Sequence, residues 1–325
     1  MKCARLMESL TVHMHSWSVI LAGGDGIRLH TLTRLISGDD RPKQFCPILG
    51  AETLLTQTRQ RLGPVISPAR TLFVVVKAHE PFYTDELGDV EPSRIVVQPR
   101  NKGTVAAILY SLVRIMEDDE EAVVAFFPAD HYYSKTEPFL AAVDSAFRMA
   151  RDRPRSLVLL GAEPAHPEVE YGWIERGAGL KRRASERVYH VNRFWEKPSL
   201  QIARELLRRG CLWNTFVMVG RATSFVDLLR SRAPDQFRAF EQLRQPNVAL
   251  DAESVHRVYD SLLQADFSQK VLSTCTERLL VLRLNVGWCD LGKPERVLAT
   301  LAQAGIEPGW ATALSGEERA YSATA

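Results

Sequence analysis

Short apolar segments alternate with amphipathic segments along the first half of the chain, and this alternation constrains the fold more than any other feature. The apolar residues are continuous within each segment, which is typical of strands covered on both faces. These segments are residues 17–22, 71–76, 94–97, 122–127 and 157–160. Apolar residues recur at three- and four-residue spacing over 105–116 and 139–147, which predicts two helices, the second capped by Thr136 or a neighbour. The alternation favours an α/β fold with a mostly parallel sheet.

The pattern loosens after Gly161. We expect strands over 171–176, 188–194, 213–219 and 279–284, and helices from 202 and over 222–243, 252–263 and 294–302. The basic stretch 181–187 is interpreted as a solvated hairpin or loop, with a ligand surface as the alternative. No linker rich in Pro, Gly or Ser divides the chain. We therefore expect one domain over 17–304, with a core to about 220 and a helical C-terminal annex with a closing strand over 221–304. A flexible leader (1–16) and a tail (305–325) flank it.

Charge and apolar content exclude several classes of protein. Lys and Arg number 41 and Asp and Glu 39, and the resulting net charge of +2 gives no support to nucleic-acid or membrane-surface binding. The longest apolar run, 122–129, is far shorter than the roughly 20 residues that cross a bilayer. Residues 1–17 lack the apolar centre of a signal peptide. Five cysteines without a C-x-x-C pair predict reduced thiols in a cytoplasmic protein.

A glycine-rich turn follows the first predicted strand. Residues 21–29 read L-A-G-G-D-G-I-R-L, which places Gly23, Gly24 and Gly26 directly after buried residues. Glycines let backbone N–H groups approach an anion, and ligands of open α/β sheets bind beyond the carboxyl ends of the strands. Arg28 adds a fork of donors suited to phosphate. A tight connection without a ligand is the alternative, because neither a Walker sequence nor G-x-G-x-x-G is present.

The loop and the P-K-Q-F sequence at 42–45 together resemble the sugar-phosphate nucleotidyltransferases. The Lys43-Gln44-Phe45 ending is similar to the mannose-1-phosphate guanylyltransferase branch. Further segments resemble family motifs in the same order, so that the resemblance spans about 17–300. These segments are residues 98–104, 128–131, 171–175, 194–198, 213–214, 266–268 and 286–290. The resemblance implies a Rossmann-like, mixed sheet of the nucleotide-diphospho-sugar transferase type, in a short form without a C-terminal extra domain.

The resemblance also implies a reaction. A sugar 1-phosphate oxygen attacks the α-phosphorus of a nucleoside triphosphate, and pyrophosphate leaves. For the guanylyltransferase branch, GTP and mannose 1-phosphate give GDP-mannose with the help of Mg²⁺. The nucleophile is already an anion, so no general base is needed. Catalysis must come from positioning and from neutralising charge.

Residue roles follow from the matching motif positions. The catalytic residues implied are Arg28, Lys43, Asp130 and Lys197. The nucleotide-binding residues implied are Leu21, Ala22, Gly23, Gly24, Gly26, Arg28, Lys43, Gln98, Asn101, Gly103, Thr104 and Asp130. Those for the sugar phosphate are Gly172, Glu175, Glu196, Lys197 and Asn214. Asp130 and Asp290 would hold Mg²⁺, a cation that prefers few protein ligands plus phosphates and water.

Each role has a plainer alternative. Taken singly, Asp130 and Asp290 are also typical of a turn or helix cap. Lys197 could be a solvated surface lysine, and Glu175 an exposed charge on a strand. His131 is not expected to act as an acid or base. Trp173 and Trp195 are interpreted as packing residues, and Cys46 and Cys289 as small apolar fillers.

Departures from the family pattern concern the substrate more than the reaction. Ile27 replaces a usual Thr, Thr31 a usual Pro, and Thr215 and Phe216 replace a frequent Ser-Gly pair. Phe216 would reshape the sugar pocket. The alternatives are therefore the same chemistry with another base or hexose 1-phosphate, or a regulatory protein that binds a nucleotide sugar without catalysis. The retained Arg28, Lys43, Asp130 and Asp290 weigh against the regulatory protein. The expected partners are small molecules, with a homodimer as one candidate assembly.

Overall fold

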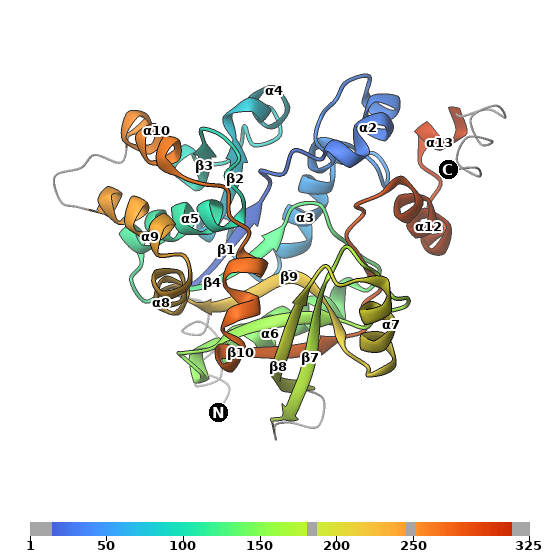
Figure 1. Ribbon diagram of the computed structural model, residues 1–325. Coiled ribbons are helices and arrows are strands. Elements are labelled where there is room, and N and C mark those ends of the chain that lie inside the picture. Colours follow the sequence, from blue (N-terminus) through green and yellow to red (C-terminus); the bar gives the residue numbers. More distant parts are fainter. Residues whose placement is uncertain (1–14, 181–186, 245–250, 314–325) are drawn as a thin grey trace, which may run out of the picture.

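A nine-stranded mixed sheet forms the centre of the computed structural model, which describes residues 15–180, 187–244 and 251–313 (Figure 1). The predicted leader, tail and basic loop lie wholly or mostly outside these residues. The strands of the sheet are β1 (Ser16–Leu21), β2 (Thr71–Val76), β3 (Ile95–Gln98), β4 (Val123–Pro128), β6 (Leu157–Ala162), β7 (Gly172–Gly179), β8 (Val188–Glu196), β9 (Leu212–Arg221) and β10 (Leu279–Leu284). Each predicted strand is present, with ends that shift by up to three residues.

The strand order is β3-β2-β1-β4-β9-β6-β10-β8-β7. Parallel ladders join β3, β2, β1 and β4, and another joins β6 to β10. Strand β9 is antiparallel to β4 and β6, and β8 is antiparallel to β10 and β7. Seven of the nine strands therefore run in one direction, which confirms the mostly parallel, mixed sheet. A small antiparallel ribbon of β5 (Tyr132–Tyr133) and β11 (Trp288–Cys289) was not predicted.

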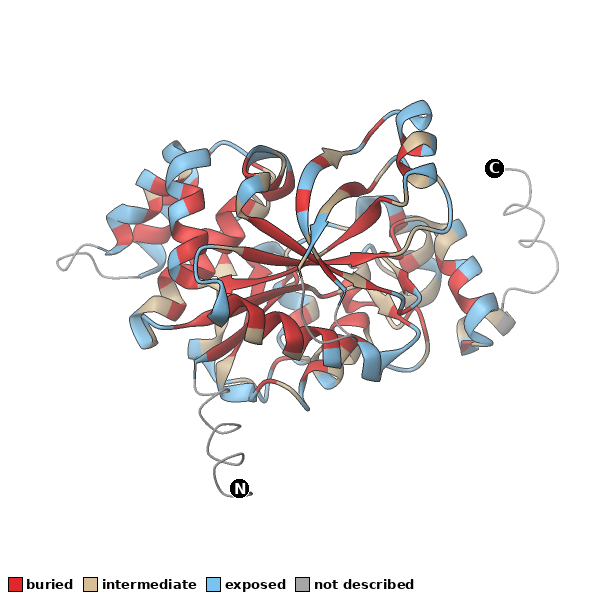
Figure 2. Ribbon diagram, turned by 90° about the horizontal axis from the view of Figure 1, so that it is seen from below, coloured by how far each residue is buried: buried red, intermediate tan, exposed pale blue. Residues whose placement is uncertain are grey.

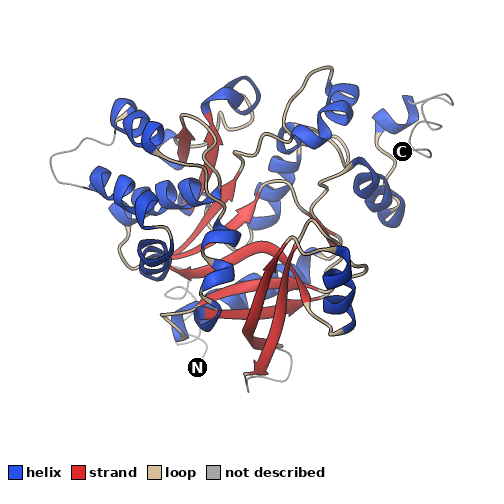
Figure 3. Ribbon diagram, viewed as in Figure 1, coloured by secondary structure: helices blue, strands red, loops and turns tan. Residues whose placement is uncertain are grey.

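Helices cover both faces of the sheet (Figure 3). On one face α5 packs on β1, β2 and β3 and joins an apolar cluster with α8, α9 and α10. On the other face α3, α6 and α7 share a second cluster with the sheet. Most strands are accordingly buried, β7 and β8 being partly exposed, and the outward sides of the helices are exposed (Figure 2). The helices are α2 (His30–Ser37), α3 (Leu54–Leu62), α4 (Glu80–Tyr83), α5 (Thr104–Asp118), α6 (Thr136–Asp152), α7 (Leu200–Arg208), α8 (Ala222–Arg232), α9 (Pro234–Glu241), α10 (Ala252–Ser261), α11 (Phe267–Lys270), α12 (Pro294–Ala304) and α13 (Gly309–Ala313).

Two expectations about helix ends are corrected. Thr136 is the first residue of α6 rather than its cap; Lys135 precedes the helix and makes no capping hydrogen bond with its side chain. The single helix expected over 222–243 is divided into α8 and α9. Pro234 lacks an N–H and disfavours helical backbone at Ala233, so one helix ends there and the next begins.

A third, smaller apolar cluster joins the N-terminal and C-terminal parts of the chain. Leu29, Cys46 and Ile48 pack there with Leu291 and Val297 of the α12 region. Cys46 is fully buried and Cys289 packs against the cluster, so both are the small fillers expected. This cluster holds the segment after the glycine loop beside residues 288–296. Strand β10, the closing strand of the predicted annex, lies inside the central sheet between β6 and β8. The division into core and annex stays a prediction.

No helix among residues 15–180, 187–244 and 251–313 combines the length and apolar content needed to cross a membrane.

Candidate active site

A cleft of about 710 Å³ opens at the carboxyl ends of β1, β3 and β4. It extends to β7, the end of β8 and the middle of β9. Most of the predicted site residues line it, although they come from segments far apart in the sequence. These are Leu21, Gly23, Gly24, Arg28, Gln98, Asn101, Gly103, Thr104, Asp130, Gly172, Glu196, Lys197, Asn214 and Asp290. Ala22, Gly26, Lys43 and Glu175 do not line it.

The glycine loop is held from behind by Gln44, a residue for which the sequence predicted no role. Gln44 is buried and donates from Nε2 to the carbonyl oxygens of Ala22 (2.9 Å) and Gly24 (2.8 Å). Gly26 has φ +65°, and a Cβ there would lie 3.0 Å from the backbone nitrogen of Lys43. Ala22 and Gly26 therefore shape the loop instead of facing the cleft. The side chain of Ile27, which follows Gly26, is exposed to solvent.

Lys43 lies immediately behind the cleft wall, between the two predicted metal carboxylates. Its Nζ is 3.2 Å from Oδ2 of Asp130 and donates to the backbone oxygen of Asp290 at 2.5 Å. The ammonium group is largely buried, so its charge is only weakly screened. Lys43 thus joins the two carboxylate segments and places a positive charge beside Asp130.

Asp290 is surrounded by donors. Its Oδ1 accepts hydrogen bonds from the Tyr171 hydroxyl (2.7 Å), the Gly292 nitrogen (3.0 Å) and Nη1 of Arg296 (2.8 Å). Burial alone would raise the pKa of Asp290, but Lys43, Tyr171 and Arg296 outweigh burial and lower it to about 2. The carboxylate therefore stays ionised at neutral pH.

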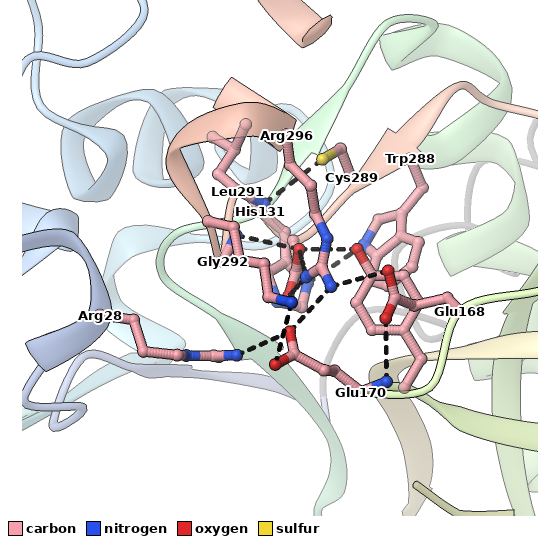
Figure 4. Close-up of polar contacts among 12 residues, drawn as sticks. Arg28, His131, Glu168, Glu170, Trp288, Cys289, Leu291, Gly292 and Arg296 are labelled. Atoms are coloured by element: carbon pink, nitrogen blue, oxygen red, sulfur yellow. Dashed lines mark hydrogen bonds and ion pairs between the residues drawn. The ribbon is translucent and has the colours of Figure 1, made fainter. Parts of the chain in front are cut away.

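Arg296 is the main site residue that the sequence did not reveal. It lies on α12, is mostly buried, and also contacts Oε2 of Glu168 at 2.8 Å and of Glu170 at 2.9 Å (Figure 4). Its guanidinium stacks over the Tyr171 ring, 4.6 Å from the centroid. In sequence it resembles any basic residue on an amphipathic helix. Only the pair of glutamates beside the Tyr171 motif hinted at a buried cation.

The donor set fits Mg²⁺ held jointly by protein and substrate. Oδ2 of Asp290 receives one hydrogen bond, from Arg296, and Asp130 faces the cleft with the ammonium of Lys43 and the imidazole of His131 as its neighbours. No group of three or more His, Cys, Asp or Glu side chains within the described ranges could hold a metal ion. Two carboxylates suit Mg²⁺, which usually keeps waters and substrate phosphates as its other ligands.

His131 remains neutral in this setting. Trp288 donates from Nε1 to Nδ1 of His131 at 3.1 Å, and burial lowers the pKa of the imidazole to about 4. Its Nε2 lies 3.8 Å from Oδ1 of Asp130. Trp288 thus fixes a neutral imidazole beside Asp130, in keeping with the expectation that His131 is not an acid or base.

The proposed base-binding segment is held together by its own side chains. Asn101 accepts a hydrogen bond from the Gly103 nitrogen (3.0 Å) and donates to Asp25 of the glycine loop (3.0 Å). Thr104 accepts from the Phe267 nitrogen at 2.7 Å, which ties α11 to the cleft. Gln98 is buried, and its Oε1 accepts from the Tyr259 hydroxyl at 3.0 Å, a contact from α10 that the sequence did not indicate.

Replacing Gly103 by Ala is expected to lower the free energy of unfolding by about 3 kcal/mol. Gly103 has φ +84°, and a Cβ there would collide with the backbone oxygen of Ala265. Gly38 is the matched control, because it has φ +80° with open space around it. Gly38→Ala should cost only the backbone term of about 1 kcal/mol. Urea unfolding measures both variants, and equal losses would show that the contact with Ala265 is unimportant.

The other side of the cleft contains the residues expected to bind the sugar phosphate. Burial raises the pKa of Glu196, and the nearby Asp266 raises it further. Oε1 of Glu196 is 3.5 Å from Nζ of Lys197. Lys197 has φ +48°, a strained conformation of the kind found at functional sites. Glu175 does not line the cleft, and its carboxylate pairs with Arg209 beyond α7, so its role in sugar binding stays a prediction.

The sequence pattern of the nucleotidyl transferase family matches residues 17–304. The chain therefore belongs to this family, which confirms the resemblance seen in its motifs. It is 30% identical over 292 residues to xanthan biosynthesis protein XanB of Xanthomonas campestris pv. campestris (strain B100), covering 88% of this chain and 60% of that protein. A mannose-1-phosphate guanylyltransferase of Sinorhizobium fredii (strain NBRC 101917 / NGR234) is 31% identical over 294 residues, covering 86% and 53%. The chain spans about three fifths or less of the length of these curated relatives.

Solved structures agree with this relationship. A crystal structure described as mannose-1-phosphate geranyltransferase from Thermus thermophilus has a TM-score of 0.75 at 29% identity, covering 88% of this chain and 80% of that chain. A UDP-glucose pyrophosphorylase complexed with UDP-glucose shares the fold, with a TM-score of 0.54 at 18% identity, covering 89% of this chain and 98% of that chain.

Proposed function

We propose that the protein transfers a guanylyl group from GTP to mannose 1-phosphate, giving GDP-mannose and pyrophosphate. The observation that carries this proposal is the meeting of two sets of residues in one cleft. Arg28 and Asp130 lie on the glycine-loop side, with Lys43 directly behind, while Gly172, Lys197 and their neighbours line the other side. The names of the curated relatives favour guanine as the base and mannose as the sugar.

In the proposed mechanism the residues neutralise and align two polyanions. Arg28 and Lys43 balance the charge of the triphosphate and of the leaving pyrophosphate, and Lys197 holds the sugar phosphate. Asp130 and Asp290 would hold Mg²⁺, which neutralises phosphate charge when bound. The attacking phosphate oxygen needs no base, which agrees with a neutral His131. By holding both substrates in the cleft, the protein brings together two anions that would rarely meet in the reactive orientation in water.

Pyrophosphate release by the purified protein with Mg²⁺ tests the proposal. The assay uses a grid of nucleoside triphosphates and hexose 1-phosphates. We expect a signal confined to GTP with mannose 1-phosphate. A signal for another pair would retain the chemistry and correct the base or sugar. Binding of GDP-mannose with no turnover of any pair would instead favour the regulatory protein.

Phe216 is expected to set selectivity for the sugar. It lines the cleft with φ +60°, a conformation that glycine adopts without strain, and its nitrogen donates to Oδ1 of Asn214 at 3.2 Å. Phe216→Gly should lower the preference for mannose 1-phosphate over other hexose 1-phosphates by about tenfold in kcat/KM, because the pocket gains room. Phe216→Tyr keeps the ring and should keep the preference. An unchanged ratio in the glycine variant would rule out contact between the ring and the sugar.

A further inference from the structure

A carboxylate occupies the part of the cleft where a polyanion is proposed to bind. Oε2 of Glu170 lies 2.9 Å from Nη1 of Arg28 and 2.9 Å from Nη2 of Arg296, and Oε1 lies 3.3 Å from Nζ of Lys293 (Figure 4). Glu170 itself lines the cleft. Its oxygens therefore take the donors that a phosphate group would otherwise use.

The partners of Glu170 differ in their freedom to move. The side chain of Arg296 is 11% exposed and is also held by Asp290 and Glu168, so it cannot readily leave. The side chain of Arg28 is 59% exposed, and the only ion pair found for it in the described part of the chain is the one with Glu170. An exposed ion pair of this kind contributes little and is easily exchanged. Arg28 can thus leave Glu170 for another anion while Glu170 stays anchored by Arg296.

We propose that Glu170 is a positioning residue that stands in for a phosphate on Arg28 and gives Arg28 up when pyrophosphate or the triphosphate binds. The proposal rests on the proposed function only in assigning Arg28 to phosphate. Its consequence is an exchange: Glu170 keeps Arg28 at the cleft when no nucleotide is bound, and competes with pyrophosphate for the same guanidinium. Glu170 therefore weakens pyrophosphate binding and favours its release.

The competition predicts a gain of affinity on removing one charge. Glu170→Gln should lower the dissociation constant for inorganic pyrophosphate, measured by calorimetry with Mg²⁺, by about tenfold, because Arg28 is no longer paired and a repelling charge is gone. Glu170→Asp keeps the charge and should stay close to the wild type. The control is Glu163→Gln, which removes a carboxylate of similar exposure that pairs with Arg283 outside the cleft. It should leave the dissociation constant unchanged.

A double-mutant cycle with Arg28→Ala distinguishes exchange from general repulsion. In the Arg28→Ala background, Glu170→Gln should change pyrophosphate affinity by less than about twofold. An equal gain in both backgrounds, or a loss of affinity in Glu170→Gln with its melting temperature unchanged, would overturn the proposal. The measurement requires no turnover. If the substrate grid is silent but the cycle shows coupling, the proposed function fails and the role of Glu170 stands.

Discussion

Replacement of Asp130 by Asn is expected to lower kcat by at least about a thousandfold, with the fold intact. The variant keeps the shape of the side chain but removes the charge that faces the cleft and lies 3.2 Å from Nζ of Lys43. A ligand to a catalytic metal supplies several kcal/mol of charge stabilisation, and each 1.36 kcal/mol is a factor of about ten in rate. Steady-state formation of GDP-mannose at saturating substrates with Mg²⁺ measures the loss.

Asp235→Asn is the matched control for this variant. Asp235 is highly exposed, forms a surface ion pair with Arg238 on α9 that contributes little, and is not among the residues that line the cleft. It should retain full activity. Unchanged turnover in Asp130→Asn would contradict both the metal assignment and the charge-based mechanism. A loss accompanied by unfolding in circular dichroism would assign Asp130 to stability instead.

Replacement of Arg296 by Met is expected to lower the free energy of unfolding by about 3 kcal/mol, because it leaves buried carboxylates without their cation. The side chains of Asp290 and Glu168 are 15% and 10% exposed, and both contact the guanidinium at 2.8 Å. Methionine fills much of the volume of the arginine side chain. The loss of stability therefore reflects the missing charge more than a change in packing. Urea unfolding at pH 7 without metal measures it.

The control for Arg296 is Arg238→Met, which removes an exposed arginine from a pair with Asp235. It should leave the unfolding midpoint unchanged. Arg296→Lys keeps the charge but cannot contact the carboxylates with a planar fork, so it should restore only part of the stability. Wild-type stability in Arg296→Met would mean that the Asp290 region tolerates uncompensated charge and that Arg296 is not its support.

The strands and the helices α5 and α6 could be predicted because their cause is local. Continuous apolar runs require cover on both faces, and the stripe over 105–116 lies on α5, which is buried between the strands β1 to β3 and the helices α8 and α9. The position of β9 between β4 and β6 could not be predicted, since antiparallel pairing over a long separation leaves no periodic signal. Helices α2 and α3 were missed for a related reason: α3 is polar on average, and only its buried face contacts the sheet.

The candidate site was predicted largely through motifs, and its gaps have physical reasons. Glu175 and Glu196 look equivalent in sequence, yet only Glu196 lines the cleft, whereas Glu175 pairs with Arg209. Arg296, on α12, supports Asp290, which precedes the helix, and this relationship depends on the fold of the α12 region. Gln44 belongs to the P-K-Q-F motif, but its role in holding the glycine loop needs the distances to Ala22 and Gly24.

Transfer of a labelled α-phosphate tests the central claim most directly. The protein is incubated with Mg²⁺, mannose 1-phosphate and GTP labelled at either the α- or the γ-phosphate. We expect the α-label to appear in GDP-mannose and the γ-label in pyrophosphate, in equal amounts. Release of the γ-label as inorganic phosphate, or absence of the α-label from any sugar nucleotide, would contradict it.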